Sequence, residues 1–202
     1  MRPSLNEIEI ESRKAARGAG LAWGLAEEAG HAVAWLAERG VNALPALLDM
    51  LAAVQQGDTV GDPLLAGIAI ADRAQMLAEG EELAYLQIRQ PVLILPFMAM
   101  AARLTGRSIV LQHEDGVWSV RPGREDAGLL ALSVKKSRIV AVKCRAEDLP
   151  LRETVEPPPA MRLEIADQTW ASLELLAQRT YVPASEESRR LGAGAGSGID
   201  ND

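Results

Sequence analysis

The chain has 202 residues, of which 48% are hydrophobic and 24% charged, a composition that allows one well-buried core. Its net charge of −7 and its pI near 5.0 argue against binding to nucleic acid or to an anionic membrane surface, because both require clustered Lys and Arg. Aromatic residues make up only 3% of the chain, so we expect a core built mainly from Leu, Val, Ile and Ala.

The cellular compartment is indicated by three further features. A single cysteine, Cys144, excludes an intramolecular disulfide and a cysteine-based zinc site. The N-terminus lacks the apolar segment of a secretory signal. The longest apolar run, residues 91–102, is too short to span a bilayer and contains Pro96. We therefore expect a cytoplasmic protein.

The first helix is predicted by a capping box at Ser4–Glu7, in which the Ser4 hydroxyl and the Glu7 carboxylate bond each other's backbone N–H. Arg13, Lys14 and Arg17 gather in its last turns, before Gly18 ends it. One interpretation is that these cations complement the negative end of the helix. The other is a patch that binds an anion or a partner.

A second helix is expected from Ala22 to Arg39, with Gly40 directly after its end. Glu27 and His31 are four residues apart on one side of it, so they lie next to each other. Such a pair is either a surface histidine beside a carboxylate or a general base with its orienting partner. The residues expected on this side are Glu27, Glu28, His31 and Trp35.

A third helix is predicted over residues 43–54, capped by Asn42 and with Pro45 in its first turn. Residues 61–63 form a turn. The apolar, alanine-rich stretch 64–77 is either a buried helix or a strand-to-helix transition.

From about Leu83 the pattern favours strands. We expect a strand at 83–88 and a short apolar helix at 97–104 that ends at Gly106. We expect four more strands, at 107–113, 117–121, 129–134 and 138–145, that form an antiparallel meander. The first two are joined by a hairpin turn at 114–116, which places His113 at the rim of the hairpin. On the last strand we expect Val140, Val142 and Cys144 on one face and Ile139, Ala141, Lys143 and Arg145 on the other. Cys144 then acts as a small buried hydrophobe.

The proline-rich stretch 148–160 predicts a stiff connector. A strand over 161–165 and a helix capped by Asp167 should follow it. The predicted fold is therefore a single α+β domain over 1–202, in which N-terminal helices pack on an antiparallel β-meander. Residues 1–80 are mainly helical, 81–147 are mainly strands, and 161–202 hold a strand, a helix and an ordered glycine-rich tail.

The glycine-rich segment 192–198 lacks the strand, helix and lysine of known phosphate-binding loops. It is either a Gly/Ser tail without fixed structure or a segment docked on the protein. We favour docking in a groove at the junction of the first two helices, because both regions combine glycine with charge. The residues expected to line a ligand site there are Arg17, Trp23, Glu27, Arg179, Tyr181, Ser185, Arg189, Gly194, Gly196, Asp200 and Asp202.

Several motifs support this pairing of the two ends. They are SLNEIE at 4–9, KAARGAG at 14–20 and WGLAEEAG at 23–30, then RTYVPASE at 179–186, GAGAG at 192–196 and DND at 200–202. The chain resembles an uncharacterised bacterial family, a domain of unknown function, over nearly its whole length and most strongly at its ends. The resemblance assigns no activity, cofactor or catalytic residue. It implies that the two terminal signatures belong together.

Two functions are compatible with these observations. The first is a non-enzymatic binding or accessory module that contacts another protein or a second copy of itself. It is favoured because the spacing of residues gives no metal-ligand set and no Ser/His/Asp order. It requires an exposed apolar patch, which we expect at 91–102 or at the Trp35 face. The second is an anionic small-molecule site or an enzyme, in which arginines hold the ligand and Glu27, Glu28, His31 or Tyr181 transfers a proton.

Overall fold

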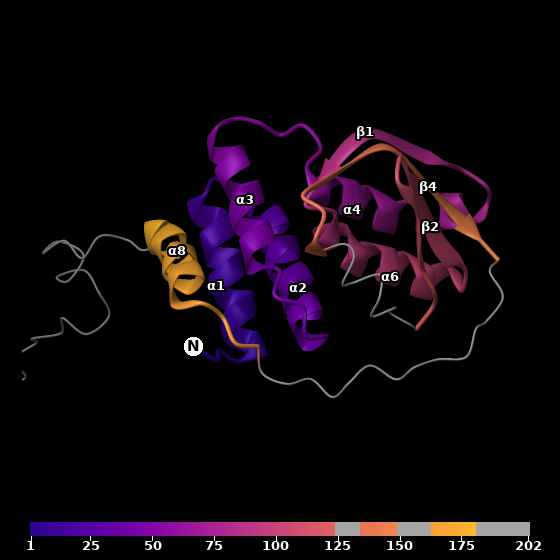
Figure 1. The fold of residues 1–202 in the computed structure, drawn as a ribbon. Helices are drawn as coiled ribbons and strands as arrows, with labels where there is room; N and C mark the ends of the chain where they lie inside the picture. The colour runs from indigo at the N-terminus through magenta and orange to yellow at the C-terminus, as the bar shows by residue number, and fades with distance from the viewer. Residues whose placement is uncertain (124–133, 149–162, 181–202) are drawn as a thin grey trace, which may run out of the picture.

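A computed structural model describes residues 1–123, 134–148 and 163–180. Four helices form one side of the protein: α1 (Leu5–Gly18), α2 (Trp23–Glu38), α3 (Leu44–Gln55) and α8 (Asp167–Ala177). The other side is an antiparallel sheet with α4 (Pro63–Asp72), α5 (Ala74–Ala78) and α6 (Leu95–Thr105) packed against it (Figure 1). The predicted α+β class is confirmed.

The helical side begins with the predicted capping box. The Ser4 hydroxyl accepts the backbone N–H of Glu7 at 3.2 Å, and the Glu7 carboxylate accepts that of Ser4 at 2.7 Å. Glycine then permits very close packing of α1 and α2, because a β-carbon on Gly30 would lie 2.9 Å from the carbonyl oxygen of Glu9. Gly40, with φ +77°, follows the end of α2 as expected.

The stretch 64–77 is helical apart from Arg73, which decides between the two predicted alternatives, a buried helix and a strand-to-helix transition. Asp62 starts α4 by accepting two backbone N–H groups, and a break at Arg73 separates α4 from α5. A 3-10 turn, η1 (Pro91–Ile94), leads directly into α6, which starts at Leu95 because proline is tolerated in the first helical turn. Gly106, with φ +68°, ends α6 as predicted.

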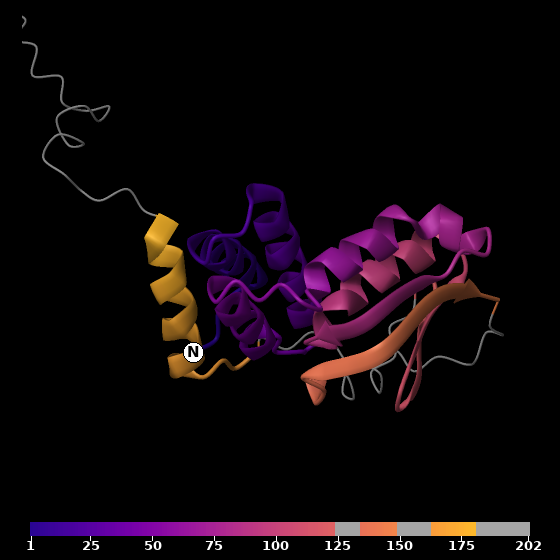
Figure 2. The same cartoon turned by 90° about the horizontal axis from the view of Figure 1, so that it is seen from above.

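The sheet contains β1 (Leu83–Arg89), β2 (Ser108–His113), β3 (Gly116–Val120) and β4 (Arg138–Glu147). All pairs are antiparallel, and the order is β1-β4-β2-β3. The last strand therefore lies between β1 and β2, which departs from a simple meander. Helices α4 and α6 cover one face of the sheet (Figure 2).

Two details of the predicted strands differ from the structure. Val134 is helical, and the rest of the predicted strand 129–134 lies outside the described residues. In β4, Ile139 is buried together with Val142 and Cys144, although strict alternation places it on the opposite face. The reason is Ala141, whose φ of +51° interrupts the alternation of the strand.

The C-terminal part of the described chain returns to α1. Ile165 exchanges two backbone hydrogen bonds with Met1, each of 2.9 Å. Of the strand expected at 161–165, residues 163–165 are not in a strand, and residues 161 and 162 lie outside the described residues. The expectation that Asp167 caps the last helix was wrong: Asp167 is the first residue of α8 and accepts the Met1 amine at 3.0 Å. Helix α8 lies beside α1 (Figure 1). Residues 149–160 of the connector expected at 148–160, and the tail at 181–202, lie outside the described residues.

Candidate functional site

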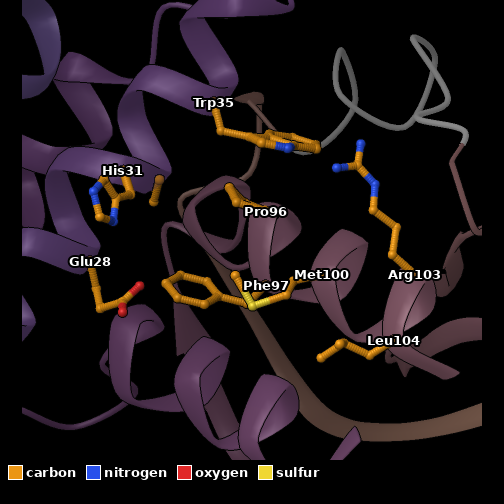
Figure 3. A pocket seen from close by; sticks show the side chains of 9 residues that line it. Glu28, His31, Trp35, Pro96, Phe97, Met100, Arg103 and Leu104 are labelled. Carbon is orange, nitrogen blue, oxygen red and sulfur yellow. The ribbon is translucent and has the colours of Figure 1, made fainter. Parts of the chain in front are cut away.

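A pocket of about 340 Å³ lies between α2 and α6 (Figure 3). Its lining from α2 is spaced at i, i+3, i+4 and i+7, and its lining from α6 at i, i+1, i+4, i+7 and i+8, so each helix contributes one face. The lining residues are Glu28, His31, Ala32 and Trp35 from α2, and Pro96, Phe97, Met100, Arg103 and Leu104 from α6.

The apolar part of the pocket is fixed on α6 by packing against α4. Phe97 is buried, and a β-carbon on Gly67 of α4 would lie 2.3 Å from its ring. The Phe97 ring therefore rests directly on the α4 backbone. Met100 and Leu104 lie one and two turns further along α6 and remain exposed, at 49% and 69%. The pocket thus opens onto apolar side chains that no described residue covers.

The opposite wall is held by a cation–π contact. The guanidinium carbon of Arg39 lies 3.7 Å from the centroid of the Trp35 ring. The same guanidinium donates to the Trp35 carbonyl at 2.9 Å and to the Glu38 carboxylate at 2.7 Å. These contacts, from the end of α2, support the indole that lines the pocket.

Charged groups stand at the two ends of the pocket. Glu28 and His31 lie at one end and Arg103 at the other, with Phe97 and Met100 between them (Figure 3). His31 points its Nε2 atom to the Glu9 carboxylate of α1, 3.5 Å away. The surface pairing of His31 is thus observed, but its partner is Glu9 and not Glu27. Glu27 is exposed and does not line the pocket.

The sequence identified both halves of this pocket without joining them. An exposed apolar patch was expected at 91–102 or at the Trp35 face. Apart from Met100 the stretch 91–102 is buried, but its Pro96, Phe97 and Met100 line one pocket with Trp35. The available signal was helical spacing on each helix: i, i+3, i+4 and i+7 on α2, and i, i+3 and i+7 for Phe97, Met100 and Leu104 on α6. Their contact could not be predicted, because the two helices are distant in the chain.

The site predicted at the helix junction is only partly described. The Arg17 guanidinium carbon lies 4.8 Å from the ring centroid of Trp23, and Arg17 donates to the Leu21 carbonyl. Arg179 belongs to η2 (Gln178–Thr180), which packs on α1. A β-carbon on Gly18 would lie 3.3 Å from that of Arg179. Outside the described residues are Tyr181, Ser185, Arg189, Gly194, Gly196, Asp200 and Asp202.

Two other reactive side chains occupy structural positions. Cys144 is buried in β4, and burial raises the pKa of its thiol to about 12. His113 is 7% exposed; its Nδ1 accepts the Asp115 N–H at 3.3 Å, and its buried Nε2 has no hydrogen-bond partner among the described residues. Burial lowers the pKa of His113.

The described ranges contain neither a metal-binding cluster nor a membrane-spanning helix. Within residues 1–123, 134–148 and 163–180, no three His, Cys, Asp or Glu side chains gather closely enough to hold a metal ion. No helix in those ranges combines the length and the hydropathy needed to cross a membrane.

Residues 3–80 match a family described as "Protein of unknown function (DUF3726)". This confirms the resemblance to an uncharacterised family. The match spans α1 to α5 and includes the three N-terminal motifs, and it ends before the three C-terminal ones. No curated protein and no solved structure matches the chain.

Proposed function

We propose that the protein is a non-enzymatic binding module, and that its pocket between α2 and α6 receives an apolar side chain of a protein partner. The observation that carries the proposal is the apolar lining built by Trp35 and Phe97, with Met100 and Leu104 exposed at its edge. Protein interfaces concentrate their binding energy in such central pockets, which take up one anchoring side chain.

The exposed residues of α6 favour a protein over a small molecule. Met100 and Leu104 extend the apolar surface outward from the pocket, so a ligand that only fills the pocket leaves much of them in water. A partner helix or loop covers both at once, and methionine adapts to such contacts. The net charge of −7 supports a protein partner over nucleic acid. The single cysteine supports the cytoplasmic location that we include in the proposal.

The volume of the pocket supports a second candidate, a small molecule. About 340 Å³ is at the lower end of the range of roughly 300–1,000 Å³ found for ligand sites. Glu28 and His31 at one end of the pocket would then orient a polar group of that molecule.

The experiment compares three forms of the full chain, recovered from the cells that encode it. They are the wild type, the double variant Met100→Gln/Leu104→Gln, and the control Leu175→Gln, whose side chain is 62% exposed on α8, away from the pocket. We expect one protein to co-purify with the wild type and the control in equal amounts and to be lost from the double variant. A partner retained by all three forms, or the absence of any partner, would overturn the proposal. A bound metabolite that is lost only from the double variant would favour the second candidate.

A further inference from the structure

The end of α1 carries a second surface, separate from the pocket. We name it the Arg17–Trp23–Arg179 surface after its three residues. Arg17 lies against the Trp23 ring, and Arg179 of η2 lies beside Gly18, the last residue of α1. One guanidinium group and one aromatic ring therefore meet at the turn between α1 and α2, and the Cβ atom of a second arginine, from a distant part of the chain, lies beside the end of α1.

This surface has an excess of positive charge. Arg17 and Arg179 form no ion pair with any described carboxylate. The negative end of the α1 dipole offsets only about half a unit charge. Trp23 is 63% exposed, whereas Trp118 and Trp170 are buried. Arginines that form no ion pair can bind carboxylates, and a large exposed indole beside them can pack against a flat backbone. A segment that has both features therefore fits this surface.

We propose that residues 181–202 of the same chain dock on the Arg17–Trp23–Arg179 surface, independently of what the α2–α6 pocket binds. This segment follows Thr180 directly, so it begins at the surface itself. It carries four carboxylates, on Glu186, Glu187, Asp200 and Asp202, against two cations, on Arg189 and Arg190. The charge of the segment is thus complementary to that of the surface.

Residues 181–202 are covalently connected to the Arg17–Trp23–Arg179 surface, so weak contacts are sufficient for them to dock there. Glu186 is seven residues after Arg179, a span of roughly 23 Å when extended, which is ample to reach Arg17. A segment tethered this closely has an effective concentration on the order of millimolar, so contacts of millimolar strength already populate the docked state. Glycine at alternate positions of 192–198 lets the backbone approach the Trp23 ring closely.

The test is hydrogen exchange of the full chain. The key variant removes the four charges with Glu186→Gln, Glu187→Gln, Asp200→Asn and Asp202→Asn; the matched control is Arg189→Gln/Arg190→Gln. We expect amides within 184–202 to exchange about tenfold or more slowly relative to an unstructured peptide in the wild type and the control, and to lose this protection in the key variant. Protection should also fall at about 0.5 M NaCl, because ion pairs at an exposed surface are screened.

The variant Trp23→Ala provides an independent check, because its exposed side chain contributes little to the core. It should reduce the protection of 184–202 and leave the melting temperature unchanged. Exchange of this segment at the rate of an unstructured peptide in the wild type would overturn the proposal. Titration with inorganic phosphate distinguishes the alternative: a change in tryptophan emission on adding phosphate that Trp23→Ala abolishes, with 184–202 unprotected throughout, would assign the arginines to an external anion.

Discussion

Arg39, directly after the last residue of α2, stacks on Trp35 of its last turn, with the guanidinium carbon 3.7 Å from the centroid of the indole ring. The contact lies at the end of α2, where Arg39 also closes the helix by donating to the Trp35 carbonyl. It holds the indole against the pocket, so the wall facing α6 is in place before any partner binds. Such preorganisation lowers the entropic cost of binding.

The pocket should bind an apolar dye through Met100 and Leu104. We expect 1-anilinonaphthalene-8-sulfonate to fluoresce on the wild type, and Met100→Gln/Leu104→Gln to weaken its affinity about tenfold, because about 1.4 kcal/mol of apolar contact is lost. Neither substitution changes the charge, and stability should stay within about 0.5 kcal/mol, since both side chains are at the surface. Leu175→Gln is the control. Equal dye affinity in all three proteins would show that the dye binds elsewhere.

Gly67→Ala should destabilise the protein by displacing Phe97. The new β-carbon would lie 2.3 Å from the ring, and such overpacking costs about 1–3 kcal/mol. Gly24→Ala is the matched control, because nothing lies within 4 Å of a β-carbon there and alanine favours the helix by up to about 1 kcal/mol. Urea unfolding measures the free energy of unfolding of both variants. In the difference between the two values, the gain in helix propensity largely cancels. If the variants are equally stable, the contact between Gly67 and Phe97 does not constrain the packing.

Two serines of α1 should respond in opposite ways to replacement by alanine. Ser12 is fully buried and its hydroxyl has no hydrogen-bond partner in the part of the chain that the structure describes, so Ser12→Ala should leave stability unchanged or raise it by about 1 kcal/mol. Ser4→Ala removes the capping box and should cost about 1 kcal/mol. Thermal and urea unfolding of both variants measure this contrast. A large loss of stability in Ser12→Ala would reveal a partner for its hydroxyl.

Stability should depend on pH through His113. Burial lowers the pKa of this imidazole in the folded protein below its ordinary value of 6.5, against the smaller opposing effect of Asp115. Below pH 6.5 the unfolded chain therefore takes up a proton that the folded protein does not, and the free energy of unfolding falls as the pH drops through the folded pKa. Above pH 6.5 this contribution is fully present.

The measurement is urea unfolding between about pH 8 and pH 5, a range that avoids most carboxylate titration. His113→Gln should remove the part of the slope due to His113, whereas the control His31→Gln, at the exposed rim of the pocket, should keep it. An unchanged slope in His113→Gln would contradict the assignment.

Local patterns in the sequence predicted most of the helices. The signals that start and end a helix act over a few residues, so they can be read from one sequence. They are the capping box at Ser4, the glycines at 40 and 106 and the helical period. The position of β4 between β1 and β2 could not be predicted, because pairs such as Leu83 with Cys144 are distant in the chain. The left-handed conformation of Ala141 reversed the expected face of Ile139, since alanine gives no signal for it.

The candidate site shows the same difference between local patterns, which the sequence reveals, and contacts between distant residues, which it does not. The expectation of an exposed apolar patch at 91–102 was wrong: within this stretch only Met100 is exposed, because periodicity does not show how deeply a helix packs into the core. Trp35 is half-buried and lines the pocket. The meeting of Trp35 and this stretch in one pocket depends on how the helices pack, and so does the pairing of His31 with Glu9. The predicted residues beyond Thr180 stay a prediction.

The most direct test of the binding role is site-specific photocrosslinking in the cells that encode the protein. A benzophenone amino acid replaces Leu104 at the edge of the pocket in one form and Leu175 on α8 in the other; both positions are exposed. We predict a crosslink to one discrete protein from position 104 and none from position 175. The absence of a crosslink from position 104, or the same products from both positions, would contradict the account.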